Sequence, residues 1–116
     1  MTNIKDVETL EGNTAESIFD WAEEIRQSRT PDYFRMIFFY RLAVGQGHAK
    51  AQNNLGTMYL RGLGMKSDAV EAANLYRQAA MQNDATVEEI VNMTAHVVLK
   101  AQQQEQARNA SRSKPA

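Results

Sequence analysis

The chain has 116 residues, a formal net charge of −1 and no cysteine. This length fits one domain with a modest core, and the lack of cysteine excludes a disulfide framework, a thiolate nucleophile and a cysteine-based zinc site. The nearly neutral charge gives no general attraction to nucleic acid or to an anionic membrane, so we expect neither as a partner.

The N-terminal residues 1–12 are polar and lack helical periodicity, so we expect them to form a mobile arm outside the folded domain. They show no basic stretch followed by an apolar one, as a secretory signal would. The longest apolar run of the chain, 36–40, is far too short to span a bilayer. A cytoplasmic protein is therefore the expectation.

A first helix is predicted over 14–27. Asn13 and Glu16 have the spacing of a capping box, which starts helices. An apolar stripe with helical spacing follows, with Phe19 beside it. Its members are Ile18, Trp21, Ala22 and Ile25.

A second helix is predicted to begin at Thr30 and Pro31 and to end near residue 44. Threonine serves as the N-cap and proline is tolerated at the first helical position. We expect this helix to bury Phe34, Ile37, Phe38 and Leu42.

The centre of the chain, 40–80, predicts a helical hairpin inside a repeat. The segment YRLA at Tyr40 recurs as YRQA at Tyr76, 36 residues later, and such a period is typical of helical solenoids. Leu55-Gly56 followed by Tyr59 matches the L-G-x2-Y core of a tetratricopeptide-type unit. We expect the small Gly56 to let helices over 48–60 and 68–81 approach closely.

Glycines and acids mark the turns of this hairpin. Gly62 and Gly64 supply left-handed freedom where the chain reverses. Asp68 and Glu71 form a second capping-box spacing. Asn83 stands one period after Gly47, so we expect it to take the same left-handed cap.

The segment AKAQNNLGTMYLRGLGMKSDAVEAANLYRQAA resembles a Sel-1-like repeat, a relative of the tetratricopeptide repeat. The resemblance covers 48–80 well, and 40–47 as the end of a preceding repeat. It implies an α/α scaffold for binding protein partners, without chemistry of its own.

A fifth helix is predicted from Thr86, where Glu89 completes another capping box. Its apolar face ends near Ala101, and residues 105–116 are expected to be a disordered tail. Shifting by one period places Asp20 and Asn92 where Gly56 stands, so the terminal units are degenerate, as the caps of a short solenoid are. The expected fold is all-α: a short α/α solenoid of about five helices in a single domain over 13–104.

Catalysis is not expected. A catalytic site needs convergent nucleophile, base and orienting groups, whereas His48 begins one helix and His96 lies inside another, with no serine motif nearby. Local packing at a turn explains His48 better than metal ligation, because no partner ligands stand at metal spacing. We expect no enzyme, no cofactor and no metal.

Two function classes remain. The first is an adaptor that binds a peptide or a partner helix in the concave groove lined by the first helix of each repeat. Translating the outward positions of the central repeat by one period in each direction gives the predicted groove residues Ser17, Trp21, Asn53, Thr57, Leu60, Glu89, Met93 and His96. Burial of Trp21 in the core is an equally good interpretation of that residue.

The second class is a structural or assembly subunit that associates through the fifth helix, as a homodimer or as part of a larger complex. The charge distribution leaves another alternative open, because residues 1–24 carry seven acids against one lysine, and residues 25–68 carry seven basic residues against two acids. Complementary packing of solvated helices explains this asymmetry more simply than an acidic recognition arm does.

Overall fold

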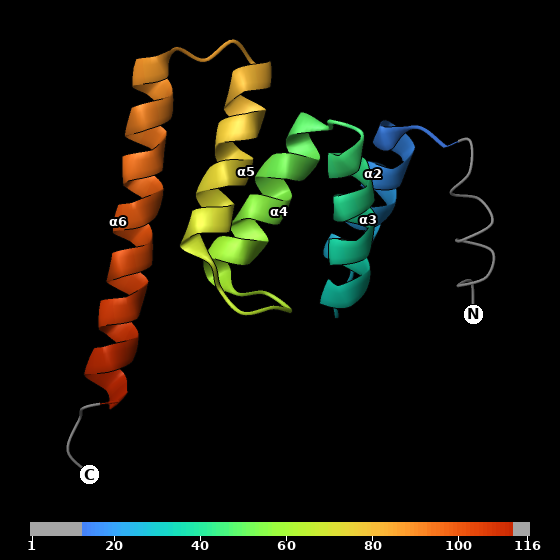
Figure 1. Ribbon diagram of the computed structural model, residues 1–116. Helices are drawn as coiled ribbons and strands as arrows, with labels where there is room; N and C mark the ends of the chain where they lie inside the picture. Colours follow the sequence, from blue (N-terminus) through green and yellow to red (C-terminus); the bar gives the residue numbers. More distant parts are fainter. Residues whose placement is uncertain (1–12, 113–116) are drawn as a thin grey trace.

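Residues 13–112 are described by a computed structural model, and they form five helices and no strand (Figure 1). In chain order these are α2 (Ala15–Arg26), α3 (Tyr33–Gly45), α4 (Ala49–Arg61), α5 (Ala69–Gln82) and α6 (Val87–Arg112). Each helix packs antiparallel to its predecessor, which confirms the predicted all-α fold. The arm predicted over 1–12 and the residues 113–116 lie outside the described residues.

Two of the predicted helix starts are confirmed in detail. The Asp68 carboxylate accepts a hydrogen bond from the Glu71 amide at 3.0 Å. Thr86 and Glu89 form the reciprocal pair, in which each side chain accepts from the amide of the other, at 3.2 and 2.8 Å. These contacts satisfy amides that have no partner inside the helix.

Two other starts are displaced by one or two residues. The N-cap of α2 is Thr14, not Asn13, and its hydroxyl accepts from the Ser17 amide at 3.1 Å. The N-cap of α3 is Asp32, not Thr30. Asp32 is a stronger capping residue than Thr30, whereas Thr14 is a weaker one than Asn13, so capping preference explains the start of α3 but not that of α2.

The α4–α5 hairpin depends on glycines, as predicted. A Cβ built on Gly56 would lie 3.2 Å from Tyr76 Cε1 and 3.3 Å from the carbonyl oxygen of Ala72, so α4 and α5 are in close contact there. Gly62 and Gly64 have φ angles of 68° and 73°. A Cβ on Gly64 would also lie 2.6 Å from the Cβ of Tyr33, so this loop packs tightly against the start of α3.

One hydrophobic core is formed by residues of α2, α3, α4 and α5. The prediction of which side of the second helix faces this core is wrong. The buried residues of α3 are Met36, Phe39, Tyr40 and Ala43. Phe34 and Phe38 are 76% and 46% exposed, and Ile37 and Leu42 are only half-buried. The segment YFRMIFFYRLAV is apolar around nearly the whole helix, so its pattern does not define which side faces the core.

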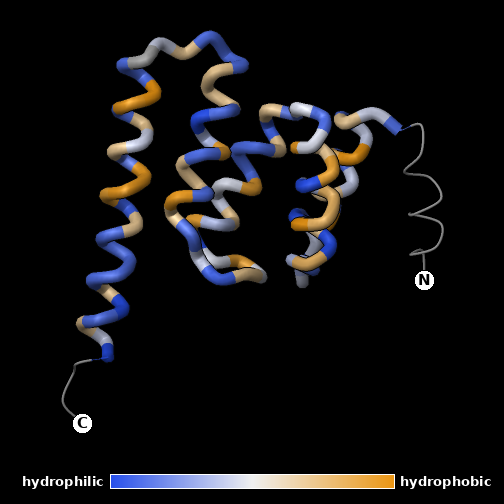
Figure 2. Tube along the Cα trace, in the orientation of Figure 1, coloured by the Kyte–Doolittle hydropathy of each residue, from blue (hydrophilic) through white to orange (hydrophobic). Residues whose placement is uncertain are grey.

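The last helix is longer than predicted. α6 continues through Arg112, so the prediction of a disordered tail from residue 105 is wrong for residues 105–112. Figure 2 shows apolar residues along its first half and hydrophilic residues towards its C-terminal end. No helix among residues 13–112 is both long and apolar enough to cross a membrane.

The left-handed residue between α5 and α6 is displaced by one position from the prediction. It is Asp84, with φ of 58°, whereas Asn83 has φ of −97°.

Candidate partner-binding grooves

Two grooves flank α4, one on each side. The first, which we call the α2–α4 groove, is a cavity of about 680 Å³ between α4 and the α2–α3 pair. Its polar lining comes from α2 and α4, and its floor is apolar. The lining includes Phe19, Glu23, Arg26, Met36, Tyr40, Lys50, Asn53, Asn54, Thr57 and Arg61.

The second, which we call the α4–α6 groove, is formed by three adjoining cavities along α6. The central cavity, of about 470 Å³, includes Leu60, Met93, Val97 and Lys100 in its lining. Met93 and Tyr76 also line a cavity of about 340 Å³ towards the start of α6. Arg61 and Gln104 also line a cavity of about 830 Å³ towards its end. From Glu89 to Arg112 this groove follows about 35 Å of helix.

A ridge on α4 separates the grooves. Asn53, Thr57 and Arg61 follow one another at i, i+4 and i+8, so they lie on one face of the helix. Each of the three lines the α2–α4 groove and also a cavity of the α4–α6 groove. A ligand in either groove therefore contacts the same edge of α4.

The structure brings most of the predicted groove residues together. Six of the eight line the α4–α6 groove: Asn53, Thr57, Leu60, Glu89, Met93 and His96. Ser17 and Trp21 line neither groove. The Ser17 amide is bonded to the N-cap of α2, and Trp21 lies in a crevice of about 230 Å³ between α2 and α3.

The orientation of α2 explains why Trp21 is elsewhere. Translation by 36 residues assumes that α2 presents the same face as α4. Instead, Phe19 and Glu23 face α4, where the Phe19 ring stacks on His48 at 4.5 Å between centroids. Trp21, on the opposite side of α2, meets the ring of Phe39 edge-on at 5.5 Å. It is half-buried there and packs against the edge of the core, away from both grooves.

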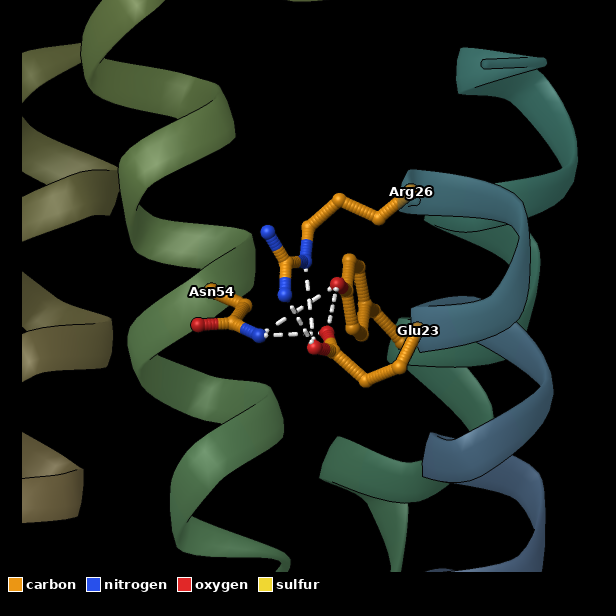
Figure 3. A network of polar contacts seen from close by, with 4 residues as sticks. Glu23, Arg26 and Asn54 are labelled. Carbon is orange, nitrogen blue, oxygen red and sulfur yellow. Dashed lines mark hydrogen bonds and ion pairs between the residues drawn. The ribbon is translucent and has the colours of Figure 1, made fainter. Parts of the chain in front are cut away.

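A polar network crosses the α2–α4 groove at Glu23 (Figure 3). The buried Tyr40 hydroxyl donates to one carboxylate oxygen of Glu23 at 2.5 Å, and the Asn54 amide donates to the same oxygen at 2.9 Å. The other oxygen accepts from Arg26 at 2.6 Å. Three helices therefore meet at one carboxylate, and this network ties α2 and α3 to α4.

The network also sets the protonation states of its members. Partial burial raises the pKa of Glu23, whereas the hydrogen bonds from Arg26, Tyr40 and Asn54 lower it. The hydrogen bonds together have the larger effect, so the pKa of Glu23 lies below its usual value. Burial and the hydrogen bond to Glu23 raise the pKa of Tyr40 well above its usual value. Glu23 is therefore a carboxylate and Tyr40 a phenol at neutral pH.

His48 has a structural role at the start of α4. Its Nδ1 accepts a hydrogen bond from the Ala51 amide at 3.1 Å, and its Nε2 lies 2.7 Å from Glu16. Within residues 13–112, no group of three or more histidines, cysteines or acids is arranged to hold a metal. His48 thus caps α4 with one ring nitrogen and joins α4 to α2 with the other.

The side chain of Thr57 makes two hydrogen-bond contacts that the sequence did not predict. Its hydroxyl donates to the Asn53 carbonyl oxygen at 3.1 Å and lies 2.6 Å from the Tyr76 hydroxyl. A Thr57→Ala variant therefore loses a hydrogen bond between α4 and α5, worth about 0.5–1.5 kcal/mol. Asn53, by contrast, is exposed.

Sequence reasoning missed the cations of the α4–α6 groove. Arg61 lies one turn after Thr57, and Lys100 lies one turn after His96, so both continue the predicted faces by four residues. Extending each row by one turn would have found them. Translation between repeats would not, because the residue one period before Lys100 is Gly64.

A comparison with known protein families matches residues 49–84 to the Sel1 repeat. Residues 49–84 form a Sel1 repeat. The match spans α4, the loop with Gly62 and Gly64, and α5, and it is as long as the period between Tyr40 and Tyr76. No curated protein and no solved structure shows a significant match to the chain. The Sel1 repeat is a helical repeat that typically mediates protein interactions and is generally non-catalytic.

Proposed function

We propose that the protein is a non-catalytic adaptor, which binds a peptide segment or a helix of a protein partner in the α4–α6 groove. The observation that carries this proposal is a row of three cavities that share lining residues along the Sel1 repeat and α6, with an apolar centre between polar ends. The volume of the central cavity, about 470 Å³, lies in the range that is typical of ligand-binding pockets. A side chain of a bound segment fits such a cavity while its backbone follows α6.

Two matched variants test this function. Leu60→Glu places a charge at the half-buried edge of the central cavity, whereas Val70→Glu makes the same change at a 73% exposed position of α5 outside both grooves. We expect a tagged Val70→Glu chain to retain the partners that the wild type captures from its native cell, and Leu60→Glu to lose them. Circular dichroism checks that both variants are folded. Equal capture by both variants would contradict the proposal.

A second candidate function is assembly through α6. Val91, Val98 and Leu99 are 59%, 43% and 52% exposed, so this helix leaves an apolar face without cover among residues 13–112. If that face pairs with a second copy or a larger complex, sedimentation shows an oligomer that Val98→Glu dissociates. A wild-type monomer over the full concentration range would exclude self-association and favour the adaptor.

A further inference from the structure

Charge is distributed unevenly along the α4–α6 groove. At its start, the carboxylate of Glu89 is held by the Thr86 amide in the cap of α6. None of the described residues that line the central cavity is acidic. The groove residues with positive or titratable nitrogen groups are Arg61, His96 and Lys100 in the centre, and Lys66, Arg108 and Arg112 towards the end.

Most of these cations lack a counterion among residues 13–112. Glu105 is the acidic residue at the far cavity, and it pairs with Arg108 at 3.2 Å. Among the ion pairs of the described residues, none involves Arg61, Lys66, Lys100 or Arg112. The chain as a whole has a net charge of −1. Four unpaired cations along one groove therefore create a local positive potential in a protein that has none overall.

The middle of the groove is aliphatic. Val97 is 4% exposed, and Leu60 and Met93 are half-buried beside it. Methionine adapts its shape to irregular apolar partners. Figure 1 shows that the last turns of α6 extend past the α4–α5 loop, so the cationic end lies directly beyond this apolar centre.

We propose that the partner segment is an acidic peptide with an apolar anchor, and that its acidic part lies towards the C-terminal end of α6. The anchor occupies the cavity at Leu60, Met93 and Val97, and the carboxylates that follow it lie between Arg61, Lys100 and Arg112. This inference rests on the peptide-binding function proposed above. Buried apolar contact supplies affinity, and the unpaired cations position the acidic part of the peptide and attract it at a distance.

The lining favours a peptide over other anionic macromolecules. Single-stranded nucleic acid binds through aromatic side chains on which bases stack. Among the described residues of the central cavity, Tyr76 is the only phenylalanine, tyrosine or tryptophan, and its hydroxyl lies 2.6 Å from that of Thr57. The apolar residues also lie inside a groove between helices, where the flat surface of a bilayer does not reach.

A fluorescent peptide with two leucines followed by four glutamates is a direct probe. Two control peptides carry glutamines in place of the glutamates, or serines in place of the leucines. We expect anisotropy measurements with the full chain to show the tightest binding for the acidic leucine peptide. Raising the salt concentration to about 0.15 M should weaken that binding, because the ion pairs at the rim are exposed.

Charge-neutral variants of the chain locate the binding site. The double variant Arg61→Gln/Lys100→Gln removes two exposed cations of the α4–α6 groove. Loss of two exposed ion pairs should weaken binding about 3- to 30-fold. The matched control is Arg29→Gln/Arg77→Gln, which removes two exposed cations outside both grooves and should leave the affinity unchanged.

The outcomes separate this inference from the proposed function. If the glutamine peptide binds as tightly as the acidic one, the inferred charge preference is wrong while peptide binding stands. If no peptide binds, the proposed function itself is contradicted. Binding of an oligonucleotide or of phosphatidylserine vesicles that the groove variant abolishes, without peptide binding, would assign the groove to that ligand and overturn the inference.

Discussion

Replacement of Gly56 tests the packing on which the grooves depend. Gly56 lies where α4 meets α5, and even a Cβ there would be 3.2 Å from Tyr76 and 3.3 Å from the backbone oxygen of Ala72. In Gly56→Ala the flexible Tyr76 ring can shift, and the helix propensity gained, up to about 1 kcal/mol, offsets part of the cost. We expect a change in unfolding free energy within about 1 kcal/mol.

Gly56→Leu should cost far more. Its branched side chain has no space between the helices, and overpacking at a close contact destabilises by about 2–4 kcal/mol. For a domain of this size, that lowers the melting temperature by roughly 10–30 °C. Thermal unfolding followed by circular dichroism measures it, with Lys50→Leu at an exposed position of α4 as the control. A melting temperature of Gly56→Leu within about 2 °C of the wild type would refute the close contact.

Three further predictions concern other parts of the fold. Because the folded-state pKa of Glu23 is lowered, its stabilising contribution is present above its unfolded pKa and is lost as pH falls through the folded value. The difference in melting temperature between wild type and Glu23→Gln should therefore be constant near neutral pH and shrink in acid, and a pH-independent difference would argue against the network. Trp21→Ala removes a half-buried ring from Phe39 and should cost about 1–3 kcal/mol in chemical denaturation, less than a core tryptophan, without changing partner affinity. Deletion of residues 107–116 should leave the melting temperature unchanged, since 107–112 are exposed, but should weaken binding of the acidic peptide; a cooperative loss of helix signal would show that α6 needs its end.

The central repeat was predictable because its signals are local. Gly56, the two loop glycines and the Asp68 cap each act on neighbours within the hairpin, and each is found where predicted. Gly56 also marks the side of α4 that faces α5, since a Cβ there would lie against Tyr76 and Ala72. Local sequence therefore determined both the hairpin and the outward row of Asn53 and Thr57.

Long-range packing was not predictable from the same signals. Tyr40, Glu23 and Asn54 come from three different helices, and nothing in the sequence spacing shows that they share a hydrogen-bond network. The buried side of α3 could not be predicted because apolar residues surround this helix. Phe34 was therefore assigned to the core although it is exposed. The prediction for Trp21 was wrong because α2 does not present to the groove the face that α4 presents.

Position-specific crosslinking tests most directly whether a partner occupies the α4–α6 groove. A photo-crosslinking amino acid at Leu60 lies at the central cavity, and one at Val98 lies on the exposed outer face of α6. In irradiated native cells, we predict a discrete covalent adduct with a partner from Leu60 and none from Val98. An adduct from Val98 alone would contradict the groove and assign the interaction to the outer face of α6.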